Sequence, residues 1–69
     1  MIQYRFDYYK GKEFLGSTYK EYANYQEALN CAKLRLNNEC DKILVCFGEN
    51  FDGYFEVKWN PQKRRNMIP

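Results

Sequence analysis

One segment of the chain, residues 24–38, places its apolar side chains at the 3.6-residue period of an α-helix. The residues on this stripe are Tyr25, Ala28, Leu29, Ala32 and Leu36. Asn24 is a good N-cap, because its side-chain oxygen can accept a free N–H of the first turn. Glu27 stands three positions later and completes a capping-box pattern. Asn37 and Asn38 are residue types that adopt the left-handed conformation ending many helices. The pattern therefore predicts one helix over this segment.

Two strands are predicted before the helix, and the first, residues 2–9, alternates between apolar and polar residues as a half-buried strand does. In the first, the predicted inward residues are Ile2, Tyr4, Phe6 and Tyr8, and the outward residues are Gln3, Arg5, Asp7 and Tyr9. Lys10, Gly11 and Lys12 form the expected turn, and residues 13–20 return. A register that places Phe6 opposite Leu15 gathers large apolar residues on one face. This register also places Ile2 opposite Tyr19.

Two further strands are predicted after the helix. Residues 42–48 are apolar on both faces, as expected of a central strand. Asp52 and Gly53 close a turn. The last strand alternates again, with Phe55, Val57 and Trp59 inward and Tyr54, Glu56 and Lys58 outward. Pro61 ends this strand, since proline cannot donate to a sheet ladder.

The order of elements predicts an α+β fold, with one helix on one face of a four-stranded antiparallel sheet. The strand order 2-1-3-4 places the most apolar strand in the interior. The alternative order 1-2-4-3 would leave that strand on an edge, where its unpaired backbone would be exposed. We expect one domain over residues 1–60, followed by a basic flexible tail over residues 61–69.

The second face of this sheet has no helix to cover it. We expect it to show Arg5, Asp7, Tyr9, Phe14, Thr18, Lys20, Leu44, Cys46, Tyr54, Glu56 and Lys58. Aromatic residues make up 19% of the 69-residue chain, which is more than a one-helix core easily buries. One interpretation is a solvated face with tolerated aromatics. The other is a contact face for a partner or for a second copy in a homodimer, because Phe14, Leu44 and Tyr54 would form a large apolar patch.

The predicted topology places basic residues at one end of the domain and acidic residues at the other, although the net charge is only +2. The turn with Lys10 and Lys12, the strand start at Lys42 and the tail share one end of the domain. The tail contributes Lys63, Arg64 and Arg65. Glu21, Glu49 and Asp52 lie at the other end. The basic end is either a solvated end or a docking site for phosphates or for an acidic protein groove.

The sequence contains no catalytic, cofactor-binding or metal-binding motif. Histidine, the commonest general base, is absent from the chain. Cys31, Cys40 and Cys46 lack the spacing of a zinc site. We expect them to be reduced thiols in a cytoplasmic protein. The N-terminal residues lack a signal-peptide layout, and no apolar run approaches the ~18 residues of a membrane span.

The helix NYQEALNCAKLRLNN, the strand KILVCFG, the strand DGYFEVKW and a basic end together resemble the small phage-encoded anti-CRISPR proteins that block type I surveillance complexes. The resemblance covers residues 24–65. It implies a helix on a bent antiparallel sheet, no enzymatic activity, and inhibition by docking on the complex and excluding target nucleic acid. The matching basic positions are Lys33, Arg35, Lys63, Arg64 and Arg65. The N-terminal hairpin departs from the family pattern and adds Lys10 and Lys12.

Three functions from different classes remain open. The first is an inhibitor that docks on a host CRISPR-Cas effector complex, a ribonucleoprotein in the host cytoplasm. The second is a direct nucleic-acid-binding module that uses the open sheet face and the basic end. The third is a structural or oligomer-forming protein. The candidate partner-binding residues are Lys10, Lys12, Lys33, Arg35, Lys63, Arg64, Arg65, Tyr9, Phe14 and Tyr54.

Overall fold

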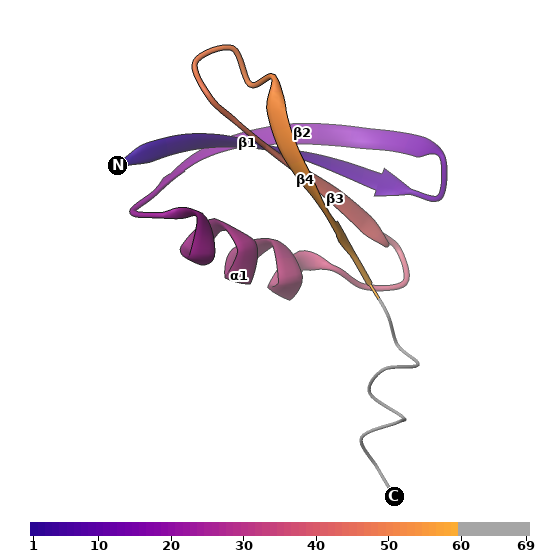
Figure 1. The fold of residues 1–69 in the computed structure, drawn as a ribbon. Helices are drawn as coiled ribbons and strands as arrows, with labels where there is room; N and C mark the ends of the chain where they lie inside the picture. The colour runs from indigo at the N-terminus through magenta and orange to yellow at the C-terminus, as the bar shows by residue number, and fades with distance from the viewer. Residues whose placement is uncertain (60–69) are drawn as a thin grey trace, which may run out of the picture.

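A computed structural model describes residues 1–59 of the chain. Its elements are β1 (Ile2–Lys10), β2 (Glu13–Tyr22), α1 (Tyr25–Arg35), β3 (Lys42–Phe47) and β4 (Gly53–Lys58). The strands form one antiparallel sheet in the order β2-β1-β3-β4, and α1 lies against one face of it (Figure 1). The predicted α+β fold and strand order are therefore confirmed. The predicted tail, residues 61–69, lies outside the described residues.

The predicted register of the β1–β2 hairpin is wrong. Phe6 pairs with Thr18 instead of Leu15, and Ile2 pairs with Tyr22 instead of Tyr19. There are two reasons for the difference. The two-residue turn follows Lys10, which pairs with Glu13, and a β-bulge then shifts the register between Tyr8 and Tyr9. A bulge leaves one residue of a strand without a direct partner, and here that residue is Leu15.

This register changes the faces predicted for β2. Thr18 and Lys20 pair with residues of β1 that face α1, so they do not lie on the open face. Ser17 and Tyr19 lie there instead. The glycine at position 16, next to the bulge, is a sign of it in the sequence. Gly16 has φ 144°, a conformation that other residues rarely adopt.

The predicted start of the helix is confirmed, but its predicted end is wrong. Asn24 is the N-cap, and its Oδ1 accepts the N–H of Glu27 at 3.0 Å. The helix ends at Arg35, because Leu36 is already extended at φ −78° and ψ 139°. Asn37 does not adopt the left-handed conformation. Its side chain instead accepts the backbone N–H groups of Glu39 and Cys40, at 2.8 and 3.0 Å, and so turns the chain toward β3.

The core lies between α1 and the three strands β1, β3 and β4. Its buried members are Tyr4, Phe6, Ala28, Ala32, Ile43, Val45 and Val57, with Leu29 and Leu36 partly buried beside them. The predicted helix stripe is thus correct in its middle. At its start, Tyr25 remains 60% exposed. Because α1 contributes two alanines at the closest approach, its backbone lies near the sheet.

Three rows of four side chains, one from each strand, make up most of the open face of the sheet. The rows, in the order β2-β1-β3-β4, are Tyr19–Arg5–Cys46–Tyr54, Ser17–Asp7–Leu44–Glu56 and Phe14–Tyr9–Lys42–Lys58. Phe14, Leu44 and Tyr54 therefore lie on three different strands and in three different rows. Polar residues stand between them, so the predicted continuous apolar patch does not form.

The middle of the open face is filled by an ion pair. Asp7 is only 8% exposed, although its position on this face predicted a solvent-facing carboxylate. Arg5 lies beside it, with Nε and Nη2 at 3.0 and 3.2 Å from the two carboxylate oxygens. Ser17 Oγ donates to the same carboxylate at 2.7 Å. The ring of Phe51, from the β3–β4 loop, lies over the Arg5 guanidinium, with its centre 5.6 Å from Arg5 Cζ.

Candidate interaction site

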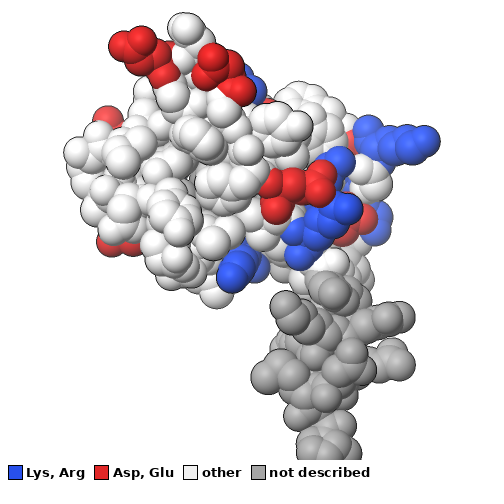
Figure 2. Space-filling view, in the orientation of Figure 1, with Lys and Arg blue, Asp and Glu red and all other residues white. Residues whose placement is uncertain are grey.

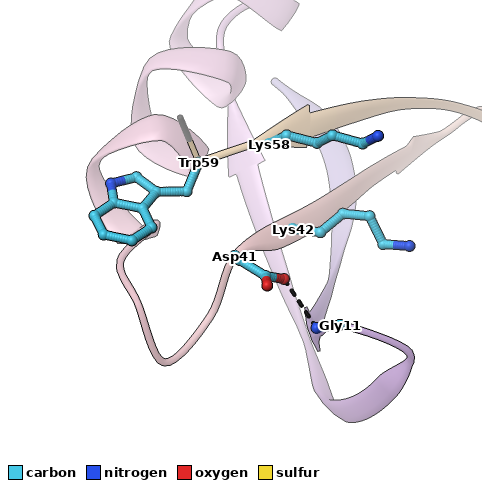
Figure 3. A pocket seen from close by; sticks show the side chains of 5 residues that line it. All are labelled: Gly11, Asp41, Lys42, Lys58 and Trp59. Atoms are coloured by element: carbon cyan, nitrogen blue, oxygen red, sulfur yellow. Dashed lines mark hydrogen bonds between the residues drawn. The ribbon is translucent and has the colours of Figure 1, made fainter. Parts of the chain in front are cut away.

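Asp41 joins three elements at the predicted basic end. Its Oδ1 accepts the backbone N–H of Gly11 at 3.0 Å, which ties the hairpin turn to the start of β3 (Figure 3). Its own N–H donates to the carbonyl of Tyr9 at 3.1 Å, and its carbonyl accepts the N–H of Trp59 at 2.9 Å. These three bonds bring Lys10, Lys12, Lys42 and Lys58 to one end of the molecule. We call these four lysines the basic pole.

The four ammonium groups of the basic pole outnumber the carboxylates of Glu13, Asp41 and Glu56 at the same end, so part of the positive charge remains. Glu56 is its nearest carboxylate partner, at 3.8 Å from Lys42 and 3.4 Å from Lys58. One carboxylate between two ammonium groups leaves a net positive charge, and ion pairs this exposed are weak. Lys10 donates to the carbonyl of Asn38 at 2.6 Å, so this ammonium is held against the loop after α1. Figure 2 shows Lys and Arg side chains gathered at this end, with carboxylates among them.

A shallow hollow of about 300 Å³ lies between the hairpin turn and the ends of β3 and β4. It is lined by Gly11, Asp41, Lys42, Lys58 and Trp59. Figure 3 shows that the two lysines extend to one side and Trp59 to the other. The side chains therefore do not converge on one point. The basic pole is a surface for docking rather than a pocket for a small ligand.

The structure separates the three predicted aromatic contact residues. Tyr9 and Phe14 form a tilted pair with ring centroids 5.4 Å apart, in the same row as Lys42 and Lys58. The Lys42 ammonium lies 4.8 Å from the centre of the Tyr9 ring. Tyr54 is in the row farthest from this pair. Only Tyr9 and Phe14 therefore belong to the surface of the basic pole.

The predicted cations outside the hairpin do not all share this surface. Lys33 and Arg35 lie in the last turn of α1. Arg35 Nη1 donates to the hydroxyl of Tyr8 at 3.2 Å, on the face of the sheet toward the helix. Lys63, Arg64 and Arg65 lie outside the described residues, so the structure does not place them.

The thiols have unequal surroundings. The Tyr22 hydroxyl donates to Cys31 Sγ at 3.1 Å, and this bond, together with the nearby Arg35 guanidinium, lowers the pKa of Cys31. Burial and the same thiol raise the pKa of Tyr22 to about 12. Burial also raises the pKa of Cys46. No histidine stands in the chain to act as a base beside Cys31, so the cluster lacks the usual partner of a cysteine nucleophile.

Sequence patterns missed three features that shape the surfaces. In the sequence, Asp41 stands out only as part of a short connection, because its bond to Gly11 depends on a contact between residues 30 positions apart. Phe51 was a turn residue with no predicted contact. A groove lined by Tyr4, Tyr25, Phe47 and Phe55 joins four separate elements. Its only sequence signal was the surplus of aromatic residues.

Comparisons with protein-family models, with curated proteins and with solved structures found no match. Within residues 1–59, no group of three or more Cys, Asp or Glu side chains is arranged to hold a metal ion. The same residues include no helix long and apolar enough to span a membrane. The basis for a function is therefore the geometry of the surfaces.

Proposed function

We propose that this protein is a non-enzymatic binding protein that docks on a macromolecular partner through the basic pole. The observation that supports this proposal is the convergence of four lysines from the hairpin turn and from the ends of β3 and β4. Clustered like charge does little for the stability of a fold. It raises the association rate and selects a partner of opposite sign.

The specific function we propose is inhibition of a host CRISPR-Cas effector complex, in the manner of the anti-CRISPR proteins that this chain resembles. The chain would dock on the complex and block its binding of target nucleic acid. Three features support this choice: the chain has 69 residues, it contains no histidine, and its element order fits the resemblance. Tyr9 and Phe14 add aromatic contact area beside the lysines.

Binding of target DNA by a purified type I surveillance complex tests this function. The complex is mixed with labelled target duplex and increasing amounts of the protein, and bound DNA is measured by gel shift. We expect the inhibition of DNA binding to saturate near one protein molecule per docking site on the complex. In cells carrying the same system, expression of the protein should restore plaque formation by a targeted phage. Full DNA binding at saturating protein, together with unchanged phage restriction, would contradict inhibition of that complex.

Direct binding of nucleic acid is the second candidate. The exposed Phe14 ring beside Tyr9 and two lysines is the arrangement that supports it, because bases stack on aromatic side chains while lysines contact phosphates. The Lys42 ammonium already covers one face of Tyr9, and Glu56 stands between Lys42 and Lys58. Both features reduce the surface available to a base or a phosphate, so this function is the weaker candidate.

Salt dependence separates the two candidates. A direct nucleic-acid binder should lose affinity for a single-stranded oligonucleotide steeply as salt rises, in proportion to the phosphates contacted. The proposed inhibitor should bind free DNA or RNA little at physiological salt. Fluorescence anisotropy with labelled single-stranded and double-stranded oligonucleotides provides this measurement without the effector complex.

A further inference from the structure

The end of the molecule opposite the basic pole is acidic. The end of β2, the start of α1 and the β3–β4 turn meet at this end, and its nearest cations are Lys20, opposite Tyr4, and Arg5, opposite Cys46. The carboxylates of this end are Glu21, Glu27, Glu49 and Asp52. Figure 2 shows mainly carboxylates at this end and a broad uncharged surface between them. The two ends of the molecule therefore differ in the sign of the charge they present.

An aromatic groove of about 250 Å³ lies at the acidic end. Its four lining residues come from β1, α1, β3 and β4, and are Tyr4, Tyr25, Phe47 and Phe55. The Phe55 ring is central: its centroid lies 6.3 Å from that of Tyr25 and 6.1 Å from that of Phe47. Tyr25 is 60% exposed and Phe47 38% exposed, so much of the surface of both rings is open to a ligand.

Gly53 fixes one wall of the groove. A Cβ at this position would lie 2.6 Å from Cε2 of Phe47, so any residue other than glycine would displace the ring from the start of β4. Tyr4 lies deeper and is 2% exposed, and its burial raises the pKa of its hydroxyl. The groove therefore has a neutral aromatic lining that is held in place from several strands.

We propose that this aromatic groove is a second binding site, which takes an Arg or Lys side chain from a basic segment of a partner protein. The faces of aromatic rings carry negative partial charge and attract cations, and an aliphatic stem packs well on the same rings. The four carboxylates at this end of the molecule outnumber Lys20 and Arg5, so the end as a whole favours a cation over nucleic acid. Charge complementarity thus selects the occupant, and it is independent of the function proposed for the basic pole.

Two short peptides that differ only in charge test the site. The probes are acetyl-Gly-Arg-Gly-amide and its citrulline analogue, which has the same shape without the positive charge. Each is titrated into the full-length protein at low salt and followed by NMR. We expect the arginine peptide to bind about tenfold more tightly than the citrulline peptide. The δ-methylene protons of arginine should shift upfield, because they lie over aromatic rings. Equal binding of both peptides would overturn the proposal.

A matched pair of variants locates the binding. Tyr25→Leu keeps an apolar side chain in the groove but removes a ring, whereas Tyr54→Leu removes a comparably exposed ring from the open face, where Tyr54 is 64% exposed. We expect only the first change to abolish the upfield shift. Gly53→Ala, which displaces the Phe47 ring, should weaken binding in the same way and provides a second test should Tyr25→Leu disturb folding. Unchanged binding in both groove variants would refute the site.

Sedimentation of the protein alone separates a foreign partner from a second copy. We expect the protein to sediment as a monomer at the concentrations used for the titrations. Concentration-dependent association that disappears when Lys63, Arg64 and Arg65 are changed to alanine would assign the groove to the tail of a second copy. That result would overturn the assignment to a partner protein.

Discussion

At the scale of single residues, a few short polar side chains make hydrogen bonds that fix the ends of elements and the contacts between them. Asn24 satisfies a backbone N–H that the helix itself leaves free, through its 3.0 Å bond to Glu27. Asp41 and Asp7 each accept hydrogen bonds from other segments of the chain. Short polar side chains of this kind determine where elements begin and how they meet.

Asn24→Ala should lower the free energy of unfolding by about 1 kcal/mol, because the capping bond to Glu27 is lost. Urea denaturation followed by circular dichroism measures the change. Asn30→Ala is the matched control, since Asn30 is an exposed residue in the middle of α1. An unchanged midpoint for Asn24→Ala would mean that the cap contributes nothing to stability.

Cys31 should react with iodoacetamide at lower pH than Cys46. The hydrogen bond from Tyr22 lowers the pKa of the Cys31 thiol, whereas burial raises the pKa of Cys46. The thiolate is the reactive form, so the rate at Cys31 should reach half its maximum at a lower pH than the rate at an ordinary thiol. Site-resolved mass spectrometry across a pH series measures both rates. Tyr22→Phe should move the midpoint of Cys31 upward; a midpoint that does not move would show that the hydroxyl has no effect.

At the scale of elements, α1 approaches the sheet through Ala28 and Ala32, both fully buried. Ala32→Leu should destabilise the fold by about 1–3 kcal/mol, because a well-packed core has no room for the larger side chain. Thermal unfolding monitored by circular dichroism gives the change. Leu34→Ala is the control, since Leu34 is 86% exposed and should tolerate the change. Equal melting temperatures for Ala32→Leu and wild type would contradict the position of the helix.

The ion pair of Arg5 and Asp7 joins β1 to its neighbours through Ser17 and Cys46. Asp7→Ala should lower the free energy of unfolding by about 2 kcal/mol, because it leaves a guanidinium partly buried without its carboxylate. The loss is less than for a fully buried pair, since the Arg5 side chain is 31% exposed. Chemical denaturation measures the loss. A double change to Arg5→Met and Asp7→Ala should recover part of it, and a further loss of similar size would contradict this interpretation.

The hydrophobic pattern predicted the elements because the helix has a 3.6-residue period, β1 and β4 alternate with a period of two, and β3 is a short continuous apolar run. Strand order followed from the apolar residues of β3, which belong in the interior of the sheet. The hairpin register could not be predicted, because a single bulge at Leu15 moves every later residue of β2 to the other face. The helix ends early for a similar local reason, since Asn37 bonds to the loop instead of capping α1.

The candidate surfaces depended more on tertiary contacts than the elements did. Lys10, Lys12 and Lys42 could be assigned to one end from the topology alone. The ion pair at Asp7 could not, because alternation along β1 indicates only which face a residue occupies. The aromatic groove could not be predicted from the sequence either, because it depends on a tertiary contact between Tyr25 of α1 and Phe55 of β4.

At the scale of the whole molecule, the sheet and helix separate two surfaces of opposite charge. The basic pole lies where the hairpin turn meets the start of β3 and the end of β4 (Figure 1). The aromatic groove lies toward the other end, between the start of α1 and the facing strands. The net charge of +2 conceals this separation. The proposed function therefore depends on the distribution of charge rather than on its total.

The most direct test of docking through the basic pole compares how fast two charge-reversal variants associate with a purified type I surveillance complex. Lys12→Glu changes the basic pole, and Lys20→Glu makes the same change in net charge on β2, away from the pole. The association rate of each variant with the immobilised complex is measured at low and at physiological salt. We expect about a tenfold slower association for Lys12→Glu at low salt, a smaller difference at physiological salt, and little change for Lys20→Glu. Equal rates for the two folded variants would contradict docking through the basic pole.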